Sequence, residues 1–529
     1  MTNFQSREKL IDDAVTTDWD IIVIGGGITG AGILREATRQ GLKVLLMEQR
    51  DFAWGTSSRS TKMVHGGLRY LKEGNIALTR ESVVERENLI KELPGLVNNR
   101  TFILPFYKDK LIKRLIVHMG LIVYDLLSKK WRKHICSREE MKIRAPHVGK
   151  DNLKGGFYIN DAVTDDARLV LRVISEALDH GATAINYCKV DRLIKENNRV
   201  CGVQFNEAET GTSYTVKGKL VINATGAWAD HLRDQVRKKT KDRIRPLRGS
   251  HIILSREKLP LVDNISIIHP SDGRPVTTLV WEGRVLMGTT DIDHKGNLDQ
   301  EASISREETD YLLVALNHQF PLLKLKSEDI ISTQAGIRPV IDTGKKNPSQ
   351  ESRDHVIWNE DGLLTVTGGK MTTFRVIALD ALKAAQQVIG PLPNLKRKHS
   401  IFSDKVNPLP NSKKPLSQES LNRLYGRYGN SVQKMIDQSS IDDLQQISGT
   451  ETIWAELQWV ATEMVVHLDD LLLRRTRLGM LLQNGGKQEM PKIQSICRLV
   501  LGWDEEKWDF EEKRYLEIWQ KYYSVPKKT

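Results

Sequence analysis

The 529-residue chain has only four cysteines, Cys136, Cys188, Cys201 and Cys497, and they lie far apart in the sequence. No two of them form a CxxC pair, which argues against a disulfide framework, a zinc site and a protein-ligated iron–sulfur cluster. We therefore expect no metal centre, and this cysteine usage fits a reducing compartment best.

Long apolar runs are also missing. Nowhere do about 18 apolar residues follow one another, which is the length that a membrane-spanning helix needs. The N-terminal stretch TNFQSREKLIDDAVTTD is polar and lacks the apolar core of a signal peptide. We expect neither a transmembrane helix nor export by that route.

Positive charge is in excess. The composition is otherwise typical of a globular protein, with 40% hydrophobic and 28% charged residues, but the net charge is +12. This excess indicates an anionic partner, such as a phosphorylated substrate, a nucleic acid or acidic lipid, and composition alone does not choose among them. Single-stranded nucleic-acid binding would call for aromatic residues interleaved in a basic stretch, and the sequence shows none, so we expect no nucleic-acid partner.

The first motif predicts a mononucleotide-binding βαβ unit. Residues 20–24 are a short apolar run typical of a buried parallel strand, residues 28–40 have helical spacing, and residues 43–47 indicate a second strand. Between the first strand and the helix stands GGGITG, which satisfies GxGxxG. We expect strand, glycine turn, helix and strand in that order.

Each glycine of this motif has a physical role. Gly25 permits the tight turn, Gly27 lets a pyrophosphate approach the backbone, and Gly30 lets the helix pack on the strand. Glu48, 23 residues after Gly25, stands where an acceptor for a ribose hydroxyl is expected. The pattern therefore predicts a bound dinucleotide.

FAD is favoured over NAD. The segment NATGAWAD, residues 223–230, supplies a second glycine turn at Ala224 and Gly226, and no second GxGxxG exists for a nicotinamide domain. We therefore expect FAD as the cofactor. The fold class that follows is α/β, with a Rossmann-like FAD-binding domain.

The rest of the chain divides by its patterns. Short β-like runs between residues 245 and 335 predict an antiparallel sheet, and a proline- and lysine-rich stretch near 390–418 indicates a connection to a helical C-terminal domain. In that domain, the long segment from Glu451 to Leu482 is mostly helical in pattern, and RRTRLG within it is strongly basic. We assign the FAD part to residues 18–100, 155–245 and 336–395, the substrate part to 101–154 and 246–335, and the helical domain to 396–529.

Several longer motifs resemble a known family. They are IGGGITGAGI, GTSSRSTKMVHGGLRYL at residues 55–71, NATGAW, GSH at 249–251, GIRPV at 336–340, SRDHVI at 352–357, GGKMTTFR at 368–375 and HLDDLLLRRTRLG. The combination resembles the FAD-dependent, quinone-linked glycerol-3-phosphate dehydrogenases of the aerobic bacterial type. The resemblance implies an amino-acid-oxidase-like flavoprotein fold and oxidation of glycerol 3-phosphate to dihydroxyacetone phosphate.

The resemblance also implies a substrate site. It places Arg69, Tyr70, Arg338, Arg353 and Lys370 at the substrate, where arginine forks and a lysine suit a phosphate dianion. His251 is the candidate general base, because a neutral imidazole can accept the hydroxyl proton, and Arg338 can stabilise a developing alkoxide. How the catalytic work divides between these two residues stays open.

Further residues are implied at the cofactor. Hydroxyls and amides of the GTSSRST segment are expected to face the FAD phosphates and ribityl chain, and the glycines that follow it are expected to pass close to the flavin. By the resemblance, the residues are Ser57, Ser58, Thr61, His65, Gly66, Gly67, Gly368, Gly369 and Thr372.

A basic amphipathic segment indicates a surface partner. Residues 111–133 place apolar residues on one helical face, with six lysines or arginines against one aspartate. This is typical of an interfacial helix on an anionic leaflet, or of a core-packing helix with a solvated basic face. The resemblance implies electron transfer to membrane quinone and peripheral attachment to the cytoplasmic face of the membrane. A homodimer, supported by the C-terminal domain, is a further expectation.

Three alternatives remain at this stage. A glycerol-3-phosphate oxidase would share the site motifs and pass its electrons to oxygen, although such relatives typically carry an insertion that has no obvious place here. An amine or amino-acid oxidase of the same fold would need fewer phosphate-binding cations. A basic nucleic-acid-binding flavoprotein is the alternative from another class.

Overall fold

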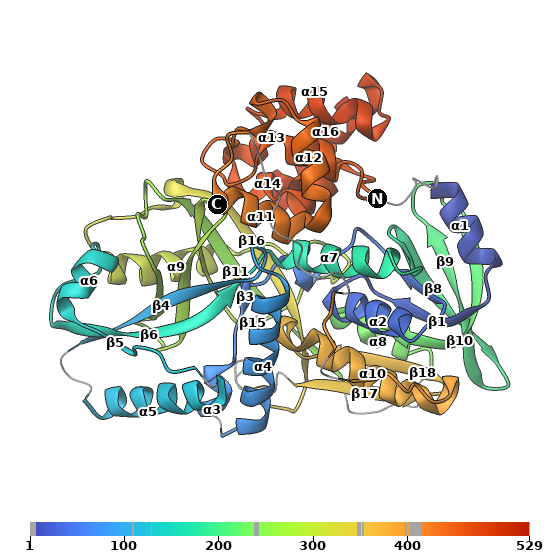
Figure 1. The fold of residues 1–529 in the computed structure, drawn as a ribbon, viewed down its shortest axis with the longest axis horizontal. Helices are drawn as coiled ribbons and strands as arrows, with labels where there is room; N and C mark the ends of the chain where they lie inside the picture. Colours follow the sequence, from blue (N-terminus) through green and yellow to red (C-terminus); the bar gives the residue numbers. More distant parts are fainter. Residues whose placement is uncertain are drawn as a thin grey trace.

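The computed structural model describes most of the chain, in two sheets and a helical C-terminal part (Figure 1). The described residues are 7–72, 74–107, 111–128, 130–236, 243–345, 351, 354–396, 399–402 and 414–527, without the side chains of 69, 72 and 111–113.

The smaller sheet contains the predicted βαβ unit. Strands β1 (Trp19–Ile24) and β2 (Val44–Met47) pair in parallel, and helix α2 (Ile28–Arg39) connects them, so this prediction is confirmed. The strand order is β17-β18-β10-β1-β2-β7, and β8 and β9 extend from β10 as an antiparallel ribbon. The added strands are β7 (Thr183–Ile185), β8 (Cys188–Glu196), β9 (Arg199–Glu207), β10 (Ser213–Asn223), β17 (His355–Glu360) and β18 (Leu363–Gly368).

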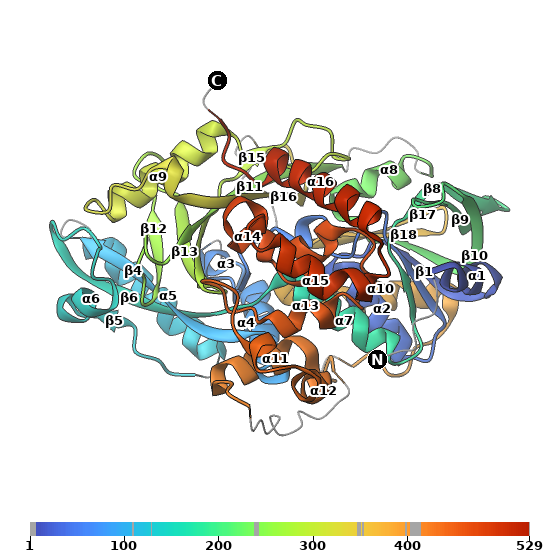
Figure 2. The same ribbon diagram turned by 90° about the horizontal axis from the view of Figure 1, so that it is seen from above.

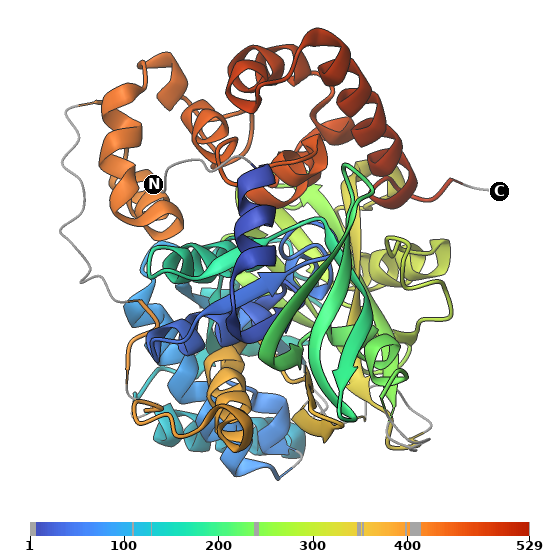
Figure 3. The same cartoon turned by 90° about the vertical axis from the view of Figure 1, so that its right-hand side faces the viewer.

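Helices cover this sheet because its parallel strands are apolar on both faces. Helix α2 packs between α7 (Asp166–Leu178) and α10 (Phe374–Ile389), and most of its residues are buried. Helix α1 (Arg7–Thr16) packs against β10 and β7, beside the green strands β8 to β10 in Figure 3. The cofactor fingerprint therefore sits at the carboxyl end of a rigid central strand.

The larger sheet is mostly antiparallel, as the sequence predicts for residues 245–335. Its order is β15-β11-β14-β13-β12-β4-β6-β3, with β16 paired to β11 and β5 to β6. The strands are β3 (Met63–Val64), β4 (Asn98–Tyr107), β5 (Ile135–Cys136), β6 (Leu153–Val163), β11 (Ile244–Ser255), β12 (Asn264–Ile268), β13 (Pro275–Trp281), β14 (Arg284–Gly288), β15 (Ile292–Asp293) and β16 (Ile330–Ile341).

Two features of this region differ from the pattern-based expectation. Helix α9 (Arg306–Gln319) was not predicted, although Ser305 and Glu308 form a capping box at its start. The strands β6 and β16 belong by hydrogen bonding to the larger sheet. The predicted boundaries near 155 and 336 therefore fall inside continuous strands.

Four other helices lie beside the larger sheet. They are α3 (Leu68–Lys72), α4 (Ile76–Glu92), α5 (Leu111–Ser128) and α6 (Arg138–Arg144), and α5 packs against α3 and α4. A short helix, α8 (Ala229–Arg233), follows the second glycine turn.

The C-terminal part is helical and lies across the boundary between the two sheets, as Figure 2 shows from above. Its helices are α11 (Gln418–Tyr428), α12 (Val432–Gln438), α13 (Trp454–Val460), α14 (Leu478–Leu481), α15 (Met490–Leu501) and α16 (Glu505–Tyr522). The segment 451–482, helical in its pattern, is broken in the structure. After α13 the chain reaches a π-helical turn, Asp470–Arg475, and Arg477 in the left-handed conformation (φ +66°) starts α14.

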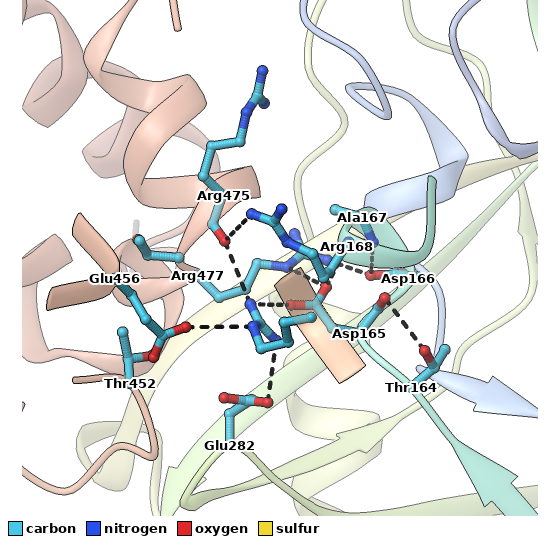
Figure 4. A network of polar contacts seen from close by, with 12 residues as sticks. Thr164, Asp165, Asp166, Ala167, Arg168, Glu282, Thr452, Glu456, Arg475 and Arg477 are labelled. Atoms are coloured by element: carbon cyan, nitrogen blue, oxygen red, sulfur yellow. Dashed lines mark hydrogen bonds and ion pairs between the residues drawn. The ribbon is translucent and has the colours of Figure 1, made fainter. Parts of the chain in front are cut away.

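The basic RRTR run is buried rather than exposed. Arg475 Nη1 lies 2.5 Å from Asp51 Oδ2, and Arg474 pairs with the same carboxylate. Arg477 Nε donates to Asp165 Oδ1 at 3.0 Å, its Nη2 pairs with Asp166, and its Nη1 donates to the carbonyl oxygen of Leu473 (Figure 4). The Arg477 pairs join the C-terminal part to the start of α7, and the Asp51 pairs join it to the loop after β2, so the run contributes little to the positive surface.

Candidate functional site

A cavity of about 610 Å³ lies where the two sheets meet. Its wall is formed by residues of the GxGxxG turn, of the loop 54–61, of the turn 224–228, of β16 and of the segment 366–372. Both glycine turns that the sequence predicts for a dinucleotide therefore open into one space.

The first glycine turn has no room for side chains. Gly25 has φ +110°, and a Cβ atom there would lie 2.6 Å from the carbonyl oxygen of Ala224. A Cβ on Gly30 would lie 1.9 Å from the carbonyl oxygen of Gly25. The amide of Ile28 donates to Ser57 Oγ at 3.0 Å, and Gly27 and Ser57 both line the cavity. The turn thus presents backbone and hydroxyl groups at a helix N-terminus, which suits phosphate oxygens.

Glu48 is fixed at the end of β2 and lines the same cavity. Its Oε2 accepts a hydrogen bond from the Gly26 amide at 2.7 Å, and its Oε1 accepts one from the Arg50 amide at 3.0 Å. Burial raises the pKa of Glu48 from its ordinary value. The remaining lone pairs of this held carboxyl group fit the hydroxyls of a ribose.

The second turn and the segment after β18 complete the cofactor wall. Ala224, Gly226, Gly368, Gly369 and Thr372 line the cavity. The three glycines have positive φ angles of +59°, +79° and +72°, which non-glycine residues rarely adopt.

The other predicted cofactor residues divide between the cavity wall and the layer behind it. Thr61 and His65 line the cavity, and Thr372 Oγ1 donates to the carbonyl oxygen of His65 at 3.2 Å. Ser58 is buried, and its carbonyl oxygen accepts from Lys62 Nζ at 2.6 Å. Gly66 and Gly67 are outside the lining, and added Cβ atoms there would meet the rings of Tyr124 and Tyr70.

A lysine and a tyrosine stand together on the cavity wall. Lys370 Nζ lies 4.1 Å from the ring centroid of Tyr70 and donates to Ser82 Oγ. Burial lowers the pKa of Lys370 to about 8, although the carboxylates of Glu81 and Asp354 act against this shift. A partly desolvated ammonium group of this kind attracts a phosphate strongly.

Arg338 lines the cavity from β16. Its Nη1 donates to Asp291 Oδ1 at 2.8 Å, and its Nη2 donates to Thr289 Oγ1 at 3.0 Å. An added Cβ on Gly249 of the neighbouring strand β11 would lie 2.3 Å from Arg338 Nη2, so only glycine leaves room for the guanidinium there. These partners hold the fork in one orientation.

His251 is buried one layer behind the cavity. Its Nε2 is hydrogen-bonded to Thr61 Oγ1 at 2.9 Å, and its Nδ1 has no hydrogen-bond partner among the described residues. Burial, and then the positive charges of Arg338 and Lys62, hold the pKa of His251 well below its ordinary value. The imidazole is therefore neutral at pH 7, and Thr61 connects it to the cavity.

Two predicted substrate residues are not described: the side chain of Arg69 and the whole of Arg353 lie outside the described residues. Sequence reasoning missed Lys62, which is fully buried, lies 2.8 Å from Asp166 Oδ1 and has a pKa lowered by burial to about 8. It also missed Thr289 and Asp291. The polar run GTTDID after an apolar strand was the available signal for these two.

Comparisons with known proteins agree with this geometry. Residues 20–375 match the family model described as "FAD dependent oxidoreductase", and residues 382–508 match "C-terminal domain of alpha-glycerophosphate oxidase". The aerobic glycerol-3-phosphate dehydrogenase of Staphylococcus haemolyticus is 34% identical over 89% of each chain. That of Staphylococcus aureus strain USA300 is also 34% identical, over 89% of this chain and 88% of the relative.

Solved structures show the same fold. The glycerol-3-phosphate dehydrogenase of Bacillus halodurans complexed with FAD has a TM-score of 0.75, with 27% identity and 97% coverage of each chain. The L-alpha-glycerophosphate oxidase of Mycoplasma pneumoniae with FAD bound has a TM-score of 0.57, with 18% identity, covering 70% of this chain and 95% of the other. At that identity the second likeness concerns the fold alone. The amino-acid-oxidase-like architecture expected from the motifs is confirmed.

Proposed function

Because this chain belongs to the family of FAD-dependent oxidoreductases that contains the aerobic glycerol-3-phosphate dehydrogenases, with FAD as cofactor, we propose that it oxidises sn-glycerol 3-phosphate to dihydroxyacetone phosphate. We propose a membrane quinone as the electron acceptor. The observation that carries the proposal is the pair of cations, Lys370 and Arg338, on the wall of the cavity that the glycine turns enter.

The residues present fit FAD. Gly25 and Gly30 lie so close to neighbouring backbone carbonyls that neither position has room for a side chain. Glu48 is fixed in the same cavity by its hydrogen bond from the Gly26 amide. Gly27 and Ser57 would hold the phosphates, Glu48 a ribose, and Gly368, Gly369 and Thr372 the far end of the cofactor. Bound there, FAD would supply the acceptor for the hydride that leaves C2 of the substrate.

The cations would bind the phosphate and polarise the reacting hydroxyl. In this proposal Lys370 attracts the phosphate dianion, and Tyr70 beside it adds a hydroxyl group; the family resemblance adds Arg69 and Arg353. Arg338, oriented by Asp291 and Thr289, stabilises the negative charge that develops on the C2 oxygen.

His251 would accept the proton through Thr61. The neutral imidazole has a free lone pair for this purpose only if the Thr61 hydroxyl donates to Nε2. The substrate hydroxyl then passes its proton to Thr61 Oγ while Thr61 passes its own proton to His251. This arrangement lets a residue that does not line the cavity serve as the base.

Helix α5 supports contact with a membrane surface. Several large apolar side chains of α5 are exposed, among them Leu115 and Ile116 at 64% each and Met119 at 53%, and Trp131 just beyond the helix is 73% exposed. Tyr124 and Leu121 face the protein interior. Among the described residues, no helix is both long and apolar enough to cross a bilayer.

The cations near α5 contribute less than the sequence suggests. Lys130 and Arg132 pair with Glu87, and Lys133 pairs with Glu140. We therefore propose that the exposed apolar face inserts at the interface and that electrostatic attraction to anionic lipid is secondary. The exposed face supports the proposed peripheral attachment, and the cytoplasmic side is proposed from the family resemblance alone.

The test is to mix the FAD-loaded protein with glycerol 3-phosphate without oxygen and to record the visible absorbance of the flavin. Loss of absorbance is expected, and faster recovery with a quinone analogue than with air supports the dehydrogenase. Equal or faster recovery in air, with peroxide formed, would make the protein a glycerol-3-phosphate oxidase.

A further inference from the structure

A second cavity, of about 810 Å³, lies between α7 and the C-terminal helices. Residues of α7 form one side, and the end of α11 with the turn Gly429–Ser431 forms the other. Helix α11 contacts α7 and lies above it, to the left, in Figure 1. Its lining shares no residue with the cofactor cavity. The volume falls in the range of small-molecule sites, about 300 to 1,000 Å³.

One part of the wall is apolar. It includes the side chains of Phe52, Leu93, Leu171, Ile174, Phe402 and Trp459. Such a surface gains about 25 cal/mol for each Å² of apolar area that a ligand removes from water. The space is therefore suited to an apolar chain or ring.

Most charged groups at this cavity already have partners. Arg168 Nη1 lies 2.8 Å from Glu463 Oε2, and Arg427 Nη2 lies 3.0 Å from Asp165 Oδ2. Glu176 is paired with Arg35 at 3.1 Å. These groups have no need of a ligand.

Arg172 is the exception. It makes no hydrogen bond or ion pair with any residue that the structure describes, and its Nε is buried without a partner. The guanidinium lies 5.3 Å from the ring centroid of Phe402. It is also held close under Gly429, where a Cβ atom would lie 2.9 Å from Nη1. A positioned cation that makes no hydrogen bond or ion pair with the described residues thus lines the cavity.

The chemistry of this cation selects the ligand. A largely buried guanidinium whose hydrogen bonds are unmade is unfavourable, and its planar fork matches a carboxylate in two parallel hydrogen bonds. Burial lowers the pKa of Arg172, although the carboxylates of Glu176, Glu463 and Asp179 act against this shift. Glu176 and Asp179 also line the cavity, so a second negative charge on the ligand would be repelled.

We propose that this cavity binds an amphiphilic monocarboxylate, whose apolar chain packs on Phe52, Leu171 and Trp459 and whose carboxylate pairs with Arg172. The ligand would bridge α7 and the C-terminal helices. This site is separate from the oxidation of glycerol 3-phosphate and does not depend on that assignment.

The probe for the test is dodecanoate, titrated by calorimetry into the FAD-loaded full-length protein below its micelle concentration. Wild-type protein binds it, and Arg172→Gln weakens binding about tenfold or more, because a charge-assisted contact is lost. Ser175→Trp, at an exposed position that lines the cavity, blocks binding by filling the entrance. Arg192→Gln, an exposed arginine outside the lining, binds as wild type does.

Two further probes separate the contributions of charge and chain. Dodecanol, without the carboxylate, binds wild type and Arg172→Gln equally, and dodecyl phosphate binds wild type more weakly than dodecanoate. Unchanged flavin absorbance and an unchanged melting temperature in each variant show that its fold is intact. Absence of dodecanoate binding, equal binding to Arg172→Gln in an intact variant, or tighter binding of dodecyl phosphate would each overturn the proposal.

Discussion

Replacing Lys370 by arginine should change the pH dependence of the reaction in a specific way. Burial lowers the pKa of Lys370 to about 8, so the free enzyme loses this positive charge as the pH rises through that value. Above it, the protonated fraction falls about tenfold for each pH unit, and kcat/KM for glycerol 3-phosphate should fall with it. Arginine keeps its charge in this range, so Lys370→Arg should remove the decline.

The size of the effect follows from the contact. Lys370→Met removes the charge at every pH, and a charge-assisted contact to phosphate contributes about 1.5 to 3 kcal/mol. This predicts a loss of kcat/KM of about 10- to 150-fold at pH 7, largely in KM. Lys370 Nζ lies over the Tyr70 ring on the cavity wall, so we expect no exposed lysine to replace it at the phosphate.

The assay is anaerobic reduction of the flavin at a series of pH values and substrate concentrations. The matched control is Lys383→Met, because Lys383 lies on α10 with its side chain 53% exposed. If kcat/KM of Lys370→Arg declines above pH 8 as steeply as that of wild type, another group carries the titration. The assignment of Lys370 to the phosphate would then be refuted.

Three further predictions concern the base, the domain contact and the membrane. Thr61→Val removes the hydroxyl between the cavity and His251, so kcat should fall by about 10² or more with little change in KM; an unchanged kcat in stopped-flow reduction excludes this relay. Arg477→Gln removes one main partner from each of the buried carboxylates Asp165 and Asp166 and should lower the free energy of unfolding by about 3 to 5 kcal/mol in denaturant titration. A loss below about 1 kcal/mol, the range of surface pairs, would mean that the network is dispensable. Met119→Glu places a charge on the exposed face of α5 and should reduce sedimentation with anionic vesicles while turnover with a soluble acceptor is kept; unchanged sedimentation would show that α5 is not the contact.

The parts of the fold that follow local patterns were predictable from sequence. The strand and helix at residues 19–39 have strong periodicity and glycine punctuation, and the structure confirms both within one residue of each predicted end. Helix α9 was missed because its capping box lies between short β-like runs that dominated the pattern. The segment 451–482 has helical periodicity, yet buried ion pairs bend it into a π-helical turn.

The burial of the RRTR run could not be read from sequence. Its partners are far away along the chain: Arg475 and Asp51 are separated by 424 positions. The local sequence of an arginine run is the same whether the run is solvated at the surface or paired with buried aspartates. For this reason the basic appearance of RRTR did not indicate a basic surface, and the net charge of +12, which already counts these aspartates, is carried by other residues.

The identities of the site residues could be predicted from sequence, but their arrangement in space could not. Motif spacing suggested Glu48, the family resemblance suggested Arg338 and Lys370, and all three line one cavity. The layer behind that cavity was not visible, so Lys62 was missed and the burial of His251 behind Thr61 was unforeseen. Such second-layer contacts depend on strand register, here that of β11 on β16, which a single sequence does not specify.

The central claim is tested most directly by the reduction of the bound flavin. Mixing the anaerobic, FAD-loaded protein with sn-glycerol 3-phosphate should bleach the flavin and form dihydroxyacetone phosphate in equal amount, while glycerol without the phosphate leaves it oxidised. Flavin that stays oxidised with sn-glycerol 3-phosphate, or is reduced equally well by glycerol, would contradict the account.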